Sequence, residues 1–289
     1  MPVLTPSTVD EVLTHLAERP DALLLSGGTD LMVEINMAHR RAPAEVVALR
    51  RVGELRTWQH NPSPSGSDRS TVTIGSAVPY AEMERGRLAE LFPALAQAAR
   101  TVGSPQIRAA GTLGGNLGTC SPAGDGLPVL SALDAIVHLR SASAARDVPV
   151  GDYMVGVKKN VLEPDELITG VTLPVRRGWQ GYSKVGVRNA MVIATASACL
   201  AMDGDQGTVS LALGAVGTTI LRCRDAENWL AGEIDLTAET QEITDAVATE
   251  FGHRAAADAR PIDDHRSTAV YRAHAVGVLA SRLLRRAQR

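Results

Sequence analysis

Two glycine pairs are the residues of this sequence whose type and spacing best suit the binding of a ligand. Gly27-Gly28 follows the apolar run Leu23–Leu25, and Gly114-Gly115 lies in the most glycine-rich stretch of the chain, residues 103–118. Without Cβ atoms a turn can bring backbone N–H groups close to an anion, and a helix that starts after the turn adds its dipole. Two such turns could hold the two phosphates of a dinucleotide, whereas an isolated glycine pair more often makes only a tight turn.

Neither turn carries one of the better-known nucleotide signatures. The first turn reads SGGTDL, which is not G-x-G-x-x-G, and no acidic residue follows at the position that a Rossmann unit requires. The sequence also lacks G-x-x-x-x-G-K-[ST], which excludes a P-loop. Nucleotide binding at these turns would therefore use a different scaffold.

Three polar side chains near the second turn allow two interpretations each. Asp125 could accept two hydrogen bonds from a ribose diol, or it could cap the helix expected at 127–133. Thr112 and Asn116 could reach a phosphate or a cofactor ring, or bond to their own backbone. The residues alone leave these alternatives open.

Metal and acid–base chemistry find little support. Cys120, Cys199 and Cys223 are far apart, so no CxxC ligand set exists, and the seven histidines show no ligand spacing. We expect no metal site and no catalytic acid or base on this chain. Cys120 lies near the second turn and could be a redox thiol or a flavin tether, although a small buried apolar residue is the more common role.

The composition of the 289 residues indicates a globular chain with room for two domains. A formal charge of −3 gives no basic surface for nucleic acid. The odd number of cysteines favours a reducing compartment, and the start of the sequence is not a signal peptide. No apolar run is long enough to span a membrane, so we expect a cytoplasmic protein.

Apolar periodicity places the elements that would position these residues. In the first part we expect helices at 9–16, 80–102 (broken near Pro93) and 127–133, and strands at 23–25, 46–49, 70–77, 135–139 and 166–174. We place a domain boundary near 176, followed by strands at 181–185, 191–202 and 208–216 and helices at 227–230 and 239–251. The tail 266–289 has six arginines and no acidic residue, which suits either a solvated helix face or a docking surface for an acidic partner.

Several of these segments together resemble one protein family. They are LLLSGGTDLM (23–32), TVTIGSAV (71–78), VGSPQIRAAGTLGGNLGTCSPAGD (102–125), DELITGVTLP (165–174), GYSKVGVRNAMVIATASACLA (181–201) and the tail 263–287. In this order they are similar to the FAD-binding medium subunit of molybdenum hydroxylases of the xanthine dehydrogenase and carbon monoxide dehydrogenase type. The resemblance covers nearly the whole chain.

The resemblance implies an α+β fold in two parts. Residues 1–176 would form a PCMH-type FAD-binding domain with subdomains of about 1–55 and 56–176. Residues 177–289 would form a C-terminal α+β domain with a three-stranded antiparallel sheet and helices.

The resemblance also implies a set of FAD-contacting residues. The first turn would cradle the diphosphate, and the second would pack against the flavin and phosphates with Thr112 as a hydroxyl donor. Asp125 would contact the adenosine side, Ile168 and Lys184 would be further contacts, and Tyr182 would lie near the cofactor. Lys184 could also raise the flavin potential by its charge, or it could be a solvated lysine at a strand edge. The expected contacts are Leu24, Leu25, Ser26, Gly27, Gly28, Thr29, Asp30, Leu31, Gly111, Thr112, Gly114, Gly115, Asn116, Asp125, Ile168, Tyr182 and Lys184.

In the family that the chain resembles, the chemistry is divided among subunits. A large subunit holds the molybdenum cofactor, a small subunit holds [2Fe–2S] clusters, and FAD on the medium subunit passes electrons to NAD⁺ or another acceptor. The resemblance therefore implies an FAD-dependent oxidoreductase subunit whose redox chemistry belongs to the cofactor. Two alternatives remain open: a free-standing FAD-dependent oxidoreductase on the same fold, and a flavin carrier or assembly subunit. The substrate, the electron acceptor and the oligomeric state are not encoded in these residues.

Overall fold

The structure of the chain, a computed structural model, describes residues 2–63, 69–238 and 242–288. These residues form two compact units, each built from separate stretches of sequence. Unit 1 comprises Met1–Glu82, Ser104–Cys120 and Ala135–Pro174, and unit 2 comprises Met83–Gly103, Ser121–Asp134 and Val175–Arg289. The division into sequence domains at residue 176 stays a prediction, because these units are not continuous in sequence.

Unit 1 begins with a small parallel sheet and one amphipathic helix. The sheet has the order β1-β3-β2, with β1 at Val3–Leu4, β2 at Leu23–Leu25 and β3 at Val46–Ala48. Helix α1 (Val9–Glu18) starts at Thr8, whose hydroxyl accepts a hydrogen bond from the Glu11 N–H. Its apolar stripe packs against residues that follow β3, with which it forms one buried cluster. The short helix α2 (Leu31–Asn36) follows the first glycine turn and buries none of its side chains.

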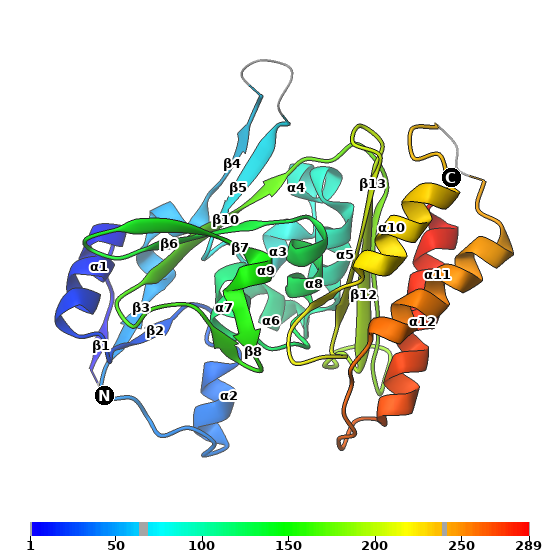
Figure 1. The fold of residues 1–289 in the computed structure, drawn as a ribbon. Helices are drawn as coiled ribbons and strands as arrows, with labels where there is room; N and C mark the ends of the chain where they lie inside the picture. The colour runs from blue at the N-terminus through cyan, green and yellow to red at the C-terminus, as the bar shows by residue number, and fades with distance from the viewer. Residues whose placement is uncertain (1, 64–68, 239–241, 289) are drawn as a thin grey trace. The chain divides into compact units, whose positions relative to one another are not determined.

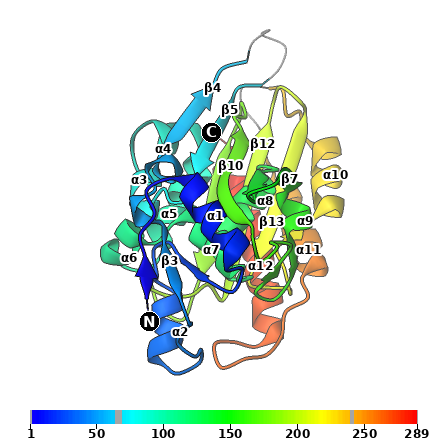
Figure 2. The ribbon, with the colours of Figure 1, turned by 90° about the vertical axis from the view of Figure 1, so that its left-hand side faces the viewer.

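A five-stranded antiparallel sheet forms the rest of the framework of unit 1. Its order is β4-β5-β10-β6-β7, with β4 at Trp58–Asn61, β5 at Thr71–Gly75, β10 at Leu167–Pro174, β6 at Ile136–Arg140 and β7 at Ala145–Pro149. Figures 1 and 2 show α1 beside β10, which it contacts. Smaller elements complete the unit: 3₁₀ turns at Leu49–Arg51 and Gly53–Arg56, helices α6 (Pro105–Ala110), α7 (Leu113–Thr119) and α9 (Val150–Tyr153), and the hairpin β8 (Met154–Gly156) and β9 (Lys159–Asn160).

Unit 2 is built on a four-stranded antiparallel sheet. The order is β11-β12-β13-β14, with β11 at Gln180–Val185, β12 at Ala196–Asp203, β13 at Thr208–Gly214 and the two-residue β14 at Leu221–Arg222. Helices α10 (Arg224–Glu233), α11 (Asp245–Asp258) and α12 (Ala269–Arg286) cover one face, while α5 (Pro93–Thr101) and α8 (Gly126–Ala132) pack on the other (Figure 1). Helix α4 (Gly86–Leu91) precedes α5, and α3 (Tyr80–Met83) crosses from one unit to the other in sequence.

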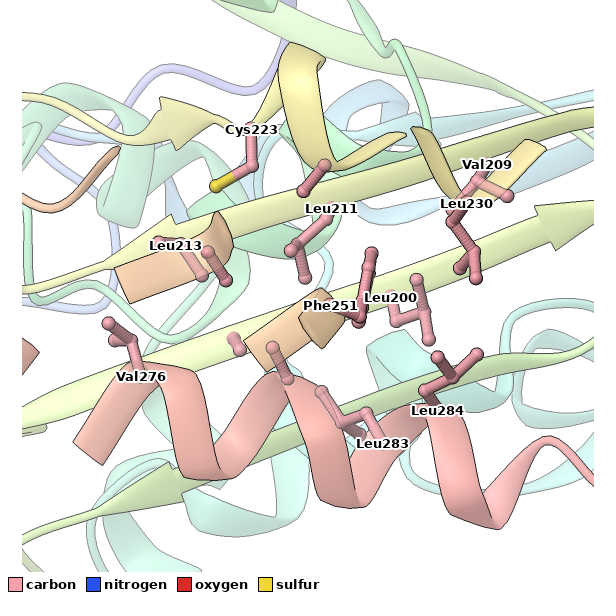
Figure 3. Close-up of a cluster of buried hydrophobic side chains, with 14 of the residues drawn as sticks. Leu200, Val209, Leu211, Leu213, Cys223, Leu230, Phe251, Val276, Leu283 and Leu284 are labelled. Atoms are coloured by element: carbon pink, nitrogen blue, oxygen red, sulfur yellow. The ribbon is translucent and has the colours of Figure 1, made fainter. Parts of the chain in front are cut away.

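The core of unit 2 lies between the sheet and its three C-terminal helices. Figure 3 shows Leu200, Leu211, Phe251 and Leu284 drawn from two strands and two helices into this space, where they are buried. Full burial of each such side chain stabilises the fold by roughly 1.5–3 kcal/mol. Helices α11 and α12 approach closely at a pair of glycines, because a Cβ on Gly277 would lie 2.8 Å from the Gly252 carbonyl oxygen.

The mixed architecture, with an antiparallel sheet and helices after residue 176, confirms the expected fold class. The three long strands of the second sheet are those expected, and β14 adds a short fourth strand at the edge. Two local predictions were wrong in extent. The helix expected at 80–102 is divided into α3, α4 and α5 by Gly86 at φ +62° and by Pro93 at the first position of α5. The strand expected at 191–202 starts at Ala196, because Met191 adopts φ +50° and leaves the extended conformation.

The expected helix 239–251 begins at Asp245, and residues 239–241 lie outside the described residues. In the described part of the chain, none of the helices combines the length and apolar character that crossing a bilayer requires.

Candidate functional site

The first glycine turn connects β2 to α2 and presents backbone N–H groups without acceptors. Among the described residues, no hydrogen bond is donated by the N–H groups of Gly27, Gly28 or Thr29. Gly28 has φ +70°, a left-handed conformation that side chains rarely adopt, so the turn depends on glycine here. Three successive unengaged N–H groups in a half-buried turn are the donor chemistry that a phosphate anion needs.

The second glycine turn uses its own N–H groups internally. Thr112 is the N-cap of α7, and its hydroxyl oxygen accepts a hydrogen bond from the Gly115 N–H at 3.0 Å. The Gly114 N–H donates to the Ser76 carbonyl at 2.9 Å, and a Cβ on Gly114 would lie 2.5 Å from Cβ of Ser76. Gly114 therefore serves close packing. A Cβ on Gly115 would meet only the Thr112 hydroxyl, at 3.1 Å, so this position is tight but less closely packed than Gly114.

The structure brings the two turns together within unit 1. The hydroxyl groups of Ser26 and Thr112, 86 positions apart, lie 2.9 Å from each other. A Cβ on Gly27 would fall 2.1 Å from the Ala110 carbonyl oxygen, so the absent side chain is what lets the backbones touch. A third link joins the ends of the following helices, where the Thr119 hydroxyl donates to Asp30 Oδ2 at 3.0 Å. The predicted residues Leu24 through Leu31 and Gly111 through Asn116 thus form one continuous assembly.

Asn116 is held by a residue that the sequence analysis missed. The hydroxyl of Tyr80 donates to Asn116 Oδ1 at 2.8 Å, and the Tyr80 N–H donates to the Gly111 carbonyl at 3.0 Å. Tyr80 therefore fixes both ends of the second turn. Neither contact follows a sequence motif, although Tyr80 could have been noted as one of the four tyrosines of an aromatic-poor chain.

Ile168 lies in β10, at the centre of the five-stranded sheet. Its side chain is 6% exposed, and the pairing of β10 with β6 is irregular between Ile168 and Gly170. The residue therefore belongs to the interior of unit 1, and its side chain offers little surface to a ligand. Its role as an FAD contact stays a prediction.

Three further predicted residues form a buried polar cluster in unit 2. Lys184 Nζ donates to Asp125 Oδ2 at 2.6 Å, and the Tyr182 hydroxyl donates to Asp125 Oδ1 at 2.8 Å. Burial raises the pKa of Asp125, although hydrogen bonds from Lys184 and Tyr182 act in the opposite direction. Burial also raises the pKa of Tyr182 well above its usual range, and the neighbouring Asp125 carboxylate adds to the effect.

This cluster argues against two structural interpretations that the sequence left open. Asp125 occupies the N-cap position of α8 but makes no side-chain cap hydrogen bond, so the capping role is not realised. Lys184 is not a solvated lysine, because its side chain is 8% exposed and its ammonium also donates to the carbonyls of Thr101 and Val192. The adjacent carboxylate compensates its charge, which weakens the idea that Lys184 raises a flavin potential.

Gln97 is a second residue that sequence reasoning missed. Its Oε1 accepts a hydrogen bond from the Tyr182 N–H at 2.8 Å, which joins α5 to the edge strand β11. The two residues are 85 positions apart, and no local pattern connects them.

Cys120 and two arginines of the basic tail make internal contacts. Cys120 is buried, its thiol donates to the Lys159 carbonyl at 3.3 Å, and burial raises its pKa to about 11. Such a thiol is a poor nucleophile at neutral pH. In the basic tail, Arg272 is buried and bound to Asp264, and Arg285 pairs with Asp245, so part of the positive charge is used internally. No cluster of three or more potential metal-ligating side chains occurs among the residues that the structure describes.

The residues of the first turn fit a diphosphate, because they combine three unengaged backbone donors with a glycine at the left-handed position 28. The fold and this turn together define a class: an α+β protein equipped for a phosphate-bearing cofactor. The chain belongs to the FAD-binding proteins of the molybdopterin dehydrogenase family, since the family model for the FAD-binding domain in molybdopterin dehydrogenase matches residues 1–176. The model for the carbon monoxide dehydrogenase flavoprotein C-terminal domain matches residues 182–287.

Individual relatives agree with this assignment. The nicotinate dehydrogenase FAD-subunit of Eubacterium barkeri is 32% identical over 251 residues, which are 83% of this chain and 82% of that protein. The carbon monoxide dehydrogenase medium chain of Afipia carboxidovorans is 30% identical over 282 residues, which are 96% of this chain and 92% of that protein. In the solved structure of reconstituted carbon monoxide dehydrogenase from Oligotropha carboxidovorans, a chain matches with a TM-score of 0.85 and 27% identity, covering 100% of this chain and 97% of that one. The resemblance seen in the sequence is confirmed.

Proposed function

We propose that this chain is the FAD-binding electron-transfer subunit of a molybdenum-containing hydroxylase or dehydrogenase complex. Its partners would be a large subunit with the molybdenum cofactor and a small subunit with [2Fe–2S] clusters. Membership of the family and its relatives' names support this proposal. NAD⁺ as the acceptor and a cytoplasmic location remain predictions.

One observation carries the assignment of the cofactor site: the unengaged N–H groups of the first glycine turn, held in place by the second turn. Gly27, Gly28 and Thr29 would donate to the diphosphate, and the Ser26–Thr112 contact would hold the loop in its donor conformation. Pre-organisation of this kind lowers the entropic cost of binding. FAD, when bound, would accept electrons singly and release them singly or in pairs.

In unit 2, Asp125 would accept hydrogen bonds from the ribose of the adenosine half. Tyr182 and Lys184 would hold the carboxylate in a fixed orientation for this contact. The assignments of Ile168, Tyr182 and Lys184 as FAD contacts belong to this proposal.

Gly115 gives the sharper test of the site, because a Cβ there would meet only the Thr112 hydroxyl, at 3.1 Å, whereas a Cβ on Gly27 would lie 2.1 Å from the Ala110 carbonyl oxygen. Gly115→Val should leave α7 folded but place a branched side chain where the cofactor would lie. The matched control is Gly118→Val on the same helix, whose Cβ would meet nothing within 4 Å.

We expect the Gly115→Val protein to lose at least about nine-tenths of its FAD, which corresponds to about 1.4 kcal/mol or more of binding free energy. The Gly118→Val protein should keep a wild-type flavin content, measured as flavin absorbance per chain after gel filtration. Circular dichroism should show both variants folded. Full flavin content in Gly115→Val would refute the placement of the site.

The subunit role has its own test, which is affinity purification of the tagged chain from its native host. Co-elution with two further polypeptides, molybdenum and [2Fe–2S] absorbance would support the proposal. A single yellow polypeptide with stoichiometric FAD would instead favour the free-standing oxidoreductase.

A further inference from the structure

Unit 2 contains a hollow that shares only Gln97 with the contacts of the candidate site. It has a volume of about 280 Å³, and it is lined by Pro93, Gln97, Gly178, Trp179, Gln180 and Arg286. These residues come from α5, from β11 and the segment before it, and from the last turn of α12. The volume is at the lower limit of small-molecule pockets, which favours a small ligand over a macromolecular one.

An aromatic wall is fixed on one side of this hollow. A Cβ on Gly181 would lie 2.2 Å from an atom of the Trp179 six-membered ring, so the glycine allows the indole to lie across β11. The Arg286 guanidinium lies over the same indole, 5.9 Å from its centroid, which adds a cation–π contact. Arg286 uses one N–H in a 3.3 Å hydrogen bond to the Ser183 hydroxyl, and its other donors remain available.

Gln180 is the most unusual residue in the lining. The residue is only 4% exposed, and its side-chain Oε1 is buried without any hydrogen-bond partner. The amide nitrogen is not enclosed in this way, and it has no acceptor among the described residues. An enclosed carbonyl is easier to tolerate than an enclosed N–H₂, so the nitrogen is the atom of this amide that is available to a ligand.

The polar groups of the hollow are therefore donors. The Oε1 of Gln97 accepts a hydrogen bond from the Tyr182 N–H, and its amide nitrogen has no acceptor in the described part of the chain. Arg286 supplies a positive charge, and no carboxylate is among the lining residues. Pro93 starts α5, whose first turn has no side-chain cap, so the positive end of the helix dipole lies at this edge.

We propose that this hollow binds a small free carboxylate carried on a flat apolar ring. The ring would pack against Pro93 and the free edge of the Trp179 indole, and the carboxylate would accept hydrogen bonds from Arg286, Gln180 and Gln97. Planar carboxylates match the fork of a guanidinium, and an apolar ring uses the indole surface that an inorganic anion would leave exposed.

Fluorine NMR of the full, FAD-loaded chain tests this with two matched probes, 4-fluorobenzoate and the neutral 4-fluorobenzamide. The wild-type protein should broaden and shift the benzoate signal, and it should bind the benzamide at least about tenfold more weakly. Equal binding of the two probes would overturn the proposal, because the hollow would then select for ring shape and not for charge. Absence of benzoate binding would overturn it as well.

Three variants locate the binding. Arg286→Gln should weaken benzoate binding at least about fivefold, and Gln180→Met should also weaken it while leaving the fold intact, because it removes an amide oxygen that has no partner. Arg282→Gln changes an exposed arginine on the same helix and should bind like the wild type. Wild-type affinity in both Arg286→Gln and Gln180→Met would refute the assignment.

Competition distinguishes the source and class of the ligand. Inorganic phosphate should not displace 4-fluorobenzoate at equal concentration, and a peptide with a C-terminal phenylalanine should compete more weakly than the free acid. Efficient displacement by phosphate, or tighter binding of the peptide, would contradict a site for small aromatic carboxylates. The flavin content of each sample, measured in parallel, separates this outcome from any failure of the FAD assignment.

Discussion

At the scale of single residues, Lys184 and Asp125 form a buried ion pair. Their side chains are 8% and 9% exposed, and the 2.6 Å contact joins an ammonium to a carboxylate whose pKa is raised by burial. A buried ion pair adds little net stability, yet removal of one partner leaves the other charge uncompensated. The pair is therefore better understood as a device that fixes the position of the Asp125 carboxylate.

This view predicts a strong coupling between the two residues. Asp125→Asn and Lys184→Met should each lower the free energy of unfolding by about 3–5 kcal/mol. The first variant leaves the Lys184 ammonium, and the second leaves the Asp125 carboxylate, buried without an opposite charge. The double variant should lose clearly less than the sum of the two losses. Urea unfolding followed by fluorescence of Trp179 and Trp229, both in unit 2, measures the cycle. Simple additivity would show that the pair does not act as a unit.

At the scale of elements, the capping of α7 links helix stability to the glycine turns. Thr112 caps α7 by accepting from the Gly115 N–H, and Thr244 caps α11 in the same way by accepting from the Val247 N–H at 3.2 Å. Thr112 differs in that its hydroxyl also contacts Ser26 of the first turn. The two threonines therefore form a matched pair for separating capping from site organisation.

We predict that Thr112→Ala and Thr244→Ala each cost about 1 kcal/mol of stability through the lost cap. Thr112→Ala alone should also lower the affinity for FAD, because it releases the first turn from the second. Thermal unfolding gives the stability of each variant, and flavin titration gives its affinity. Equal FAD affinities in the two variants would show that the Ser26–Thr112 contact does not organise the site.

A second element-scale contact gives a pH-dependent prediction. Asp264, in the segment before α12, receives a hydrogen bond from the buried Arg272 at 2.6 Å. Burial by itself raises the pKa of Asp264, but hydrogen bonds from the Arg266 N–H, Arg272 and the Ser267 N–H outweigh it and lower the pKa to about 2. Since an unfolded aspartate titrates near pH 3.9, the stabilisation is complete above about pH 4 and is lost as the pH falls toward 2.

Asp264→Asn should therefore destabilise the protein by about 2 kcal/mol at pH 7, and the difference from wild type should shrink between about pH 4 and pH 2. Urea unfolding at a series of pH values measures this difference. The control is Asp205→Asn, which removes a half-exposed carboxylate 3.9 Å from Arg177 and should change stability little. A difference that stays constant down to pH 2 would mean that Asp264 is not the titrating group.

Helices and strands could be predicted from the sequence where their buried apolar residues recur at regular spacing. The stripe at Val9, Val12, Leu13 and Leu16 indicated α1, and all four residues are buried. The error at 191–195 shows the limit of the method, because Met191 and Ile193 are apolar but 55% and 53% exposed, and periodicity cannot separate an exposed apolar loop from a strand.

Within the candidate site, the turns could be predicted because glycine pairs constrain the local backbone. Their mutual contact could not, since it joins Ser26 to Thr112 across 86 positions. The contacts of Gln97 and Tyr80 are also tertiary hydrogen bonds with no local signal.

At the scale of the whole molecule, the three cysteines report separately on the two units. Cys120 lies in unit 1, at the end of α7, whereas Cys199 and Cys223 lie in unit 2, and all three are free and buried. Burial raises the pKa of Cys120 to about 11 and that of Cys199 to about 12, and it also raises the pKa of Cys223. Modification by a thiol reagent at pH 8 should therefore require opening of the structure.

Cys199 lies opposite Tyr182 in the sheet, so its labelling rate reports on the opening of β11, whose side chains bond to Asp125. In the same way, the labelling rate of Cys120 reports on the opening of α7, which carries Gly115. If both units contribute to FAD binding, FAD at a concentration of about 100 times Kd should slow the labelling of both thiols by up to about 100-fold, because each opening must release the cofactor. Mass spectrometry of tryptic peptides measures each rate, and Gly115→Val with the same FAD is the control that should show no slowing. Slowing at Cys120 alone would restrict the cofactor to unit 1 and remove Asp125, Tyr182 and Lys184 from the site. Rapid labelling of Cys120 in the folded protein would instead show that its thiol is reactive, contrary to what its burial predicts.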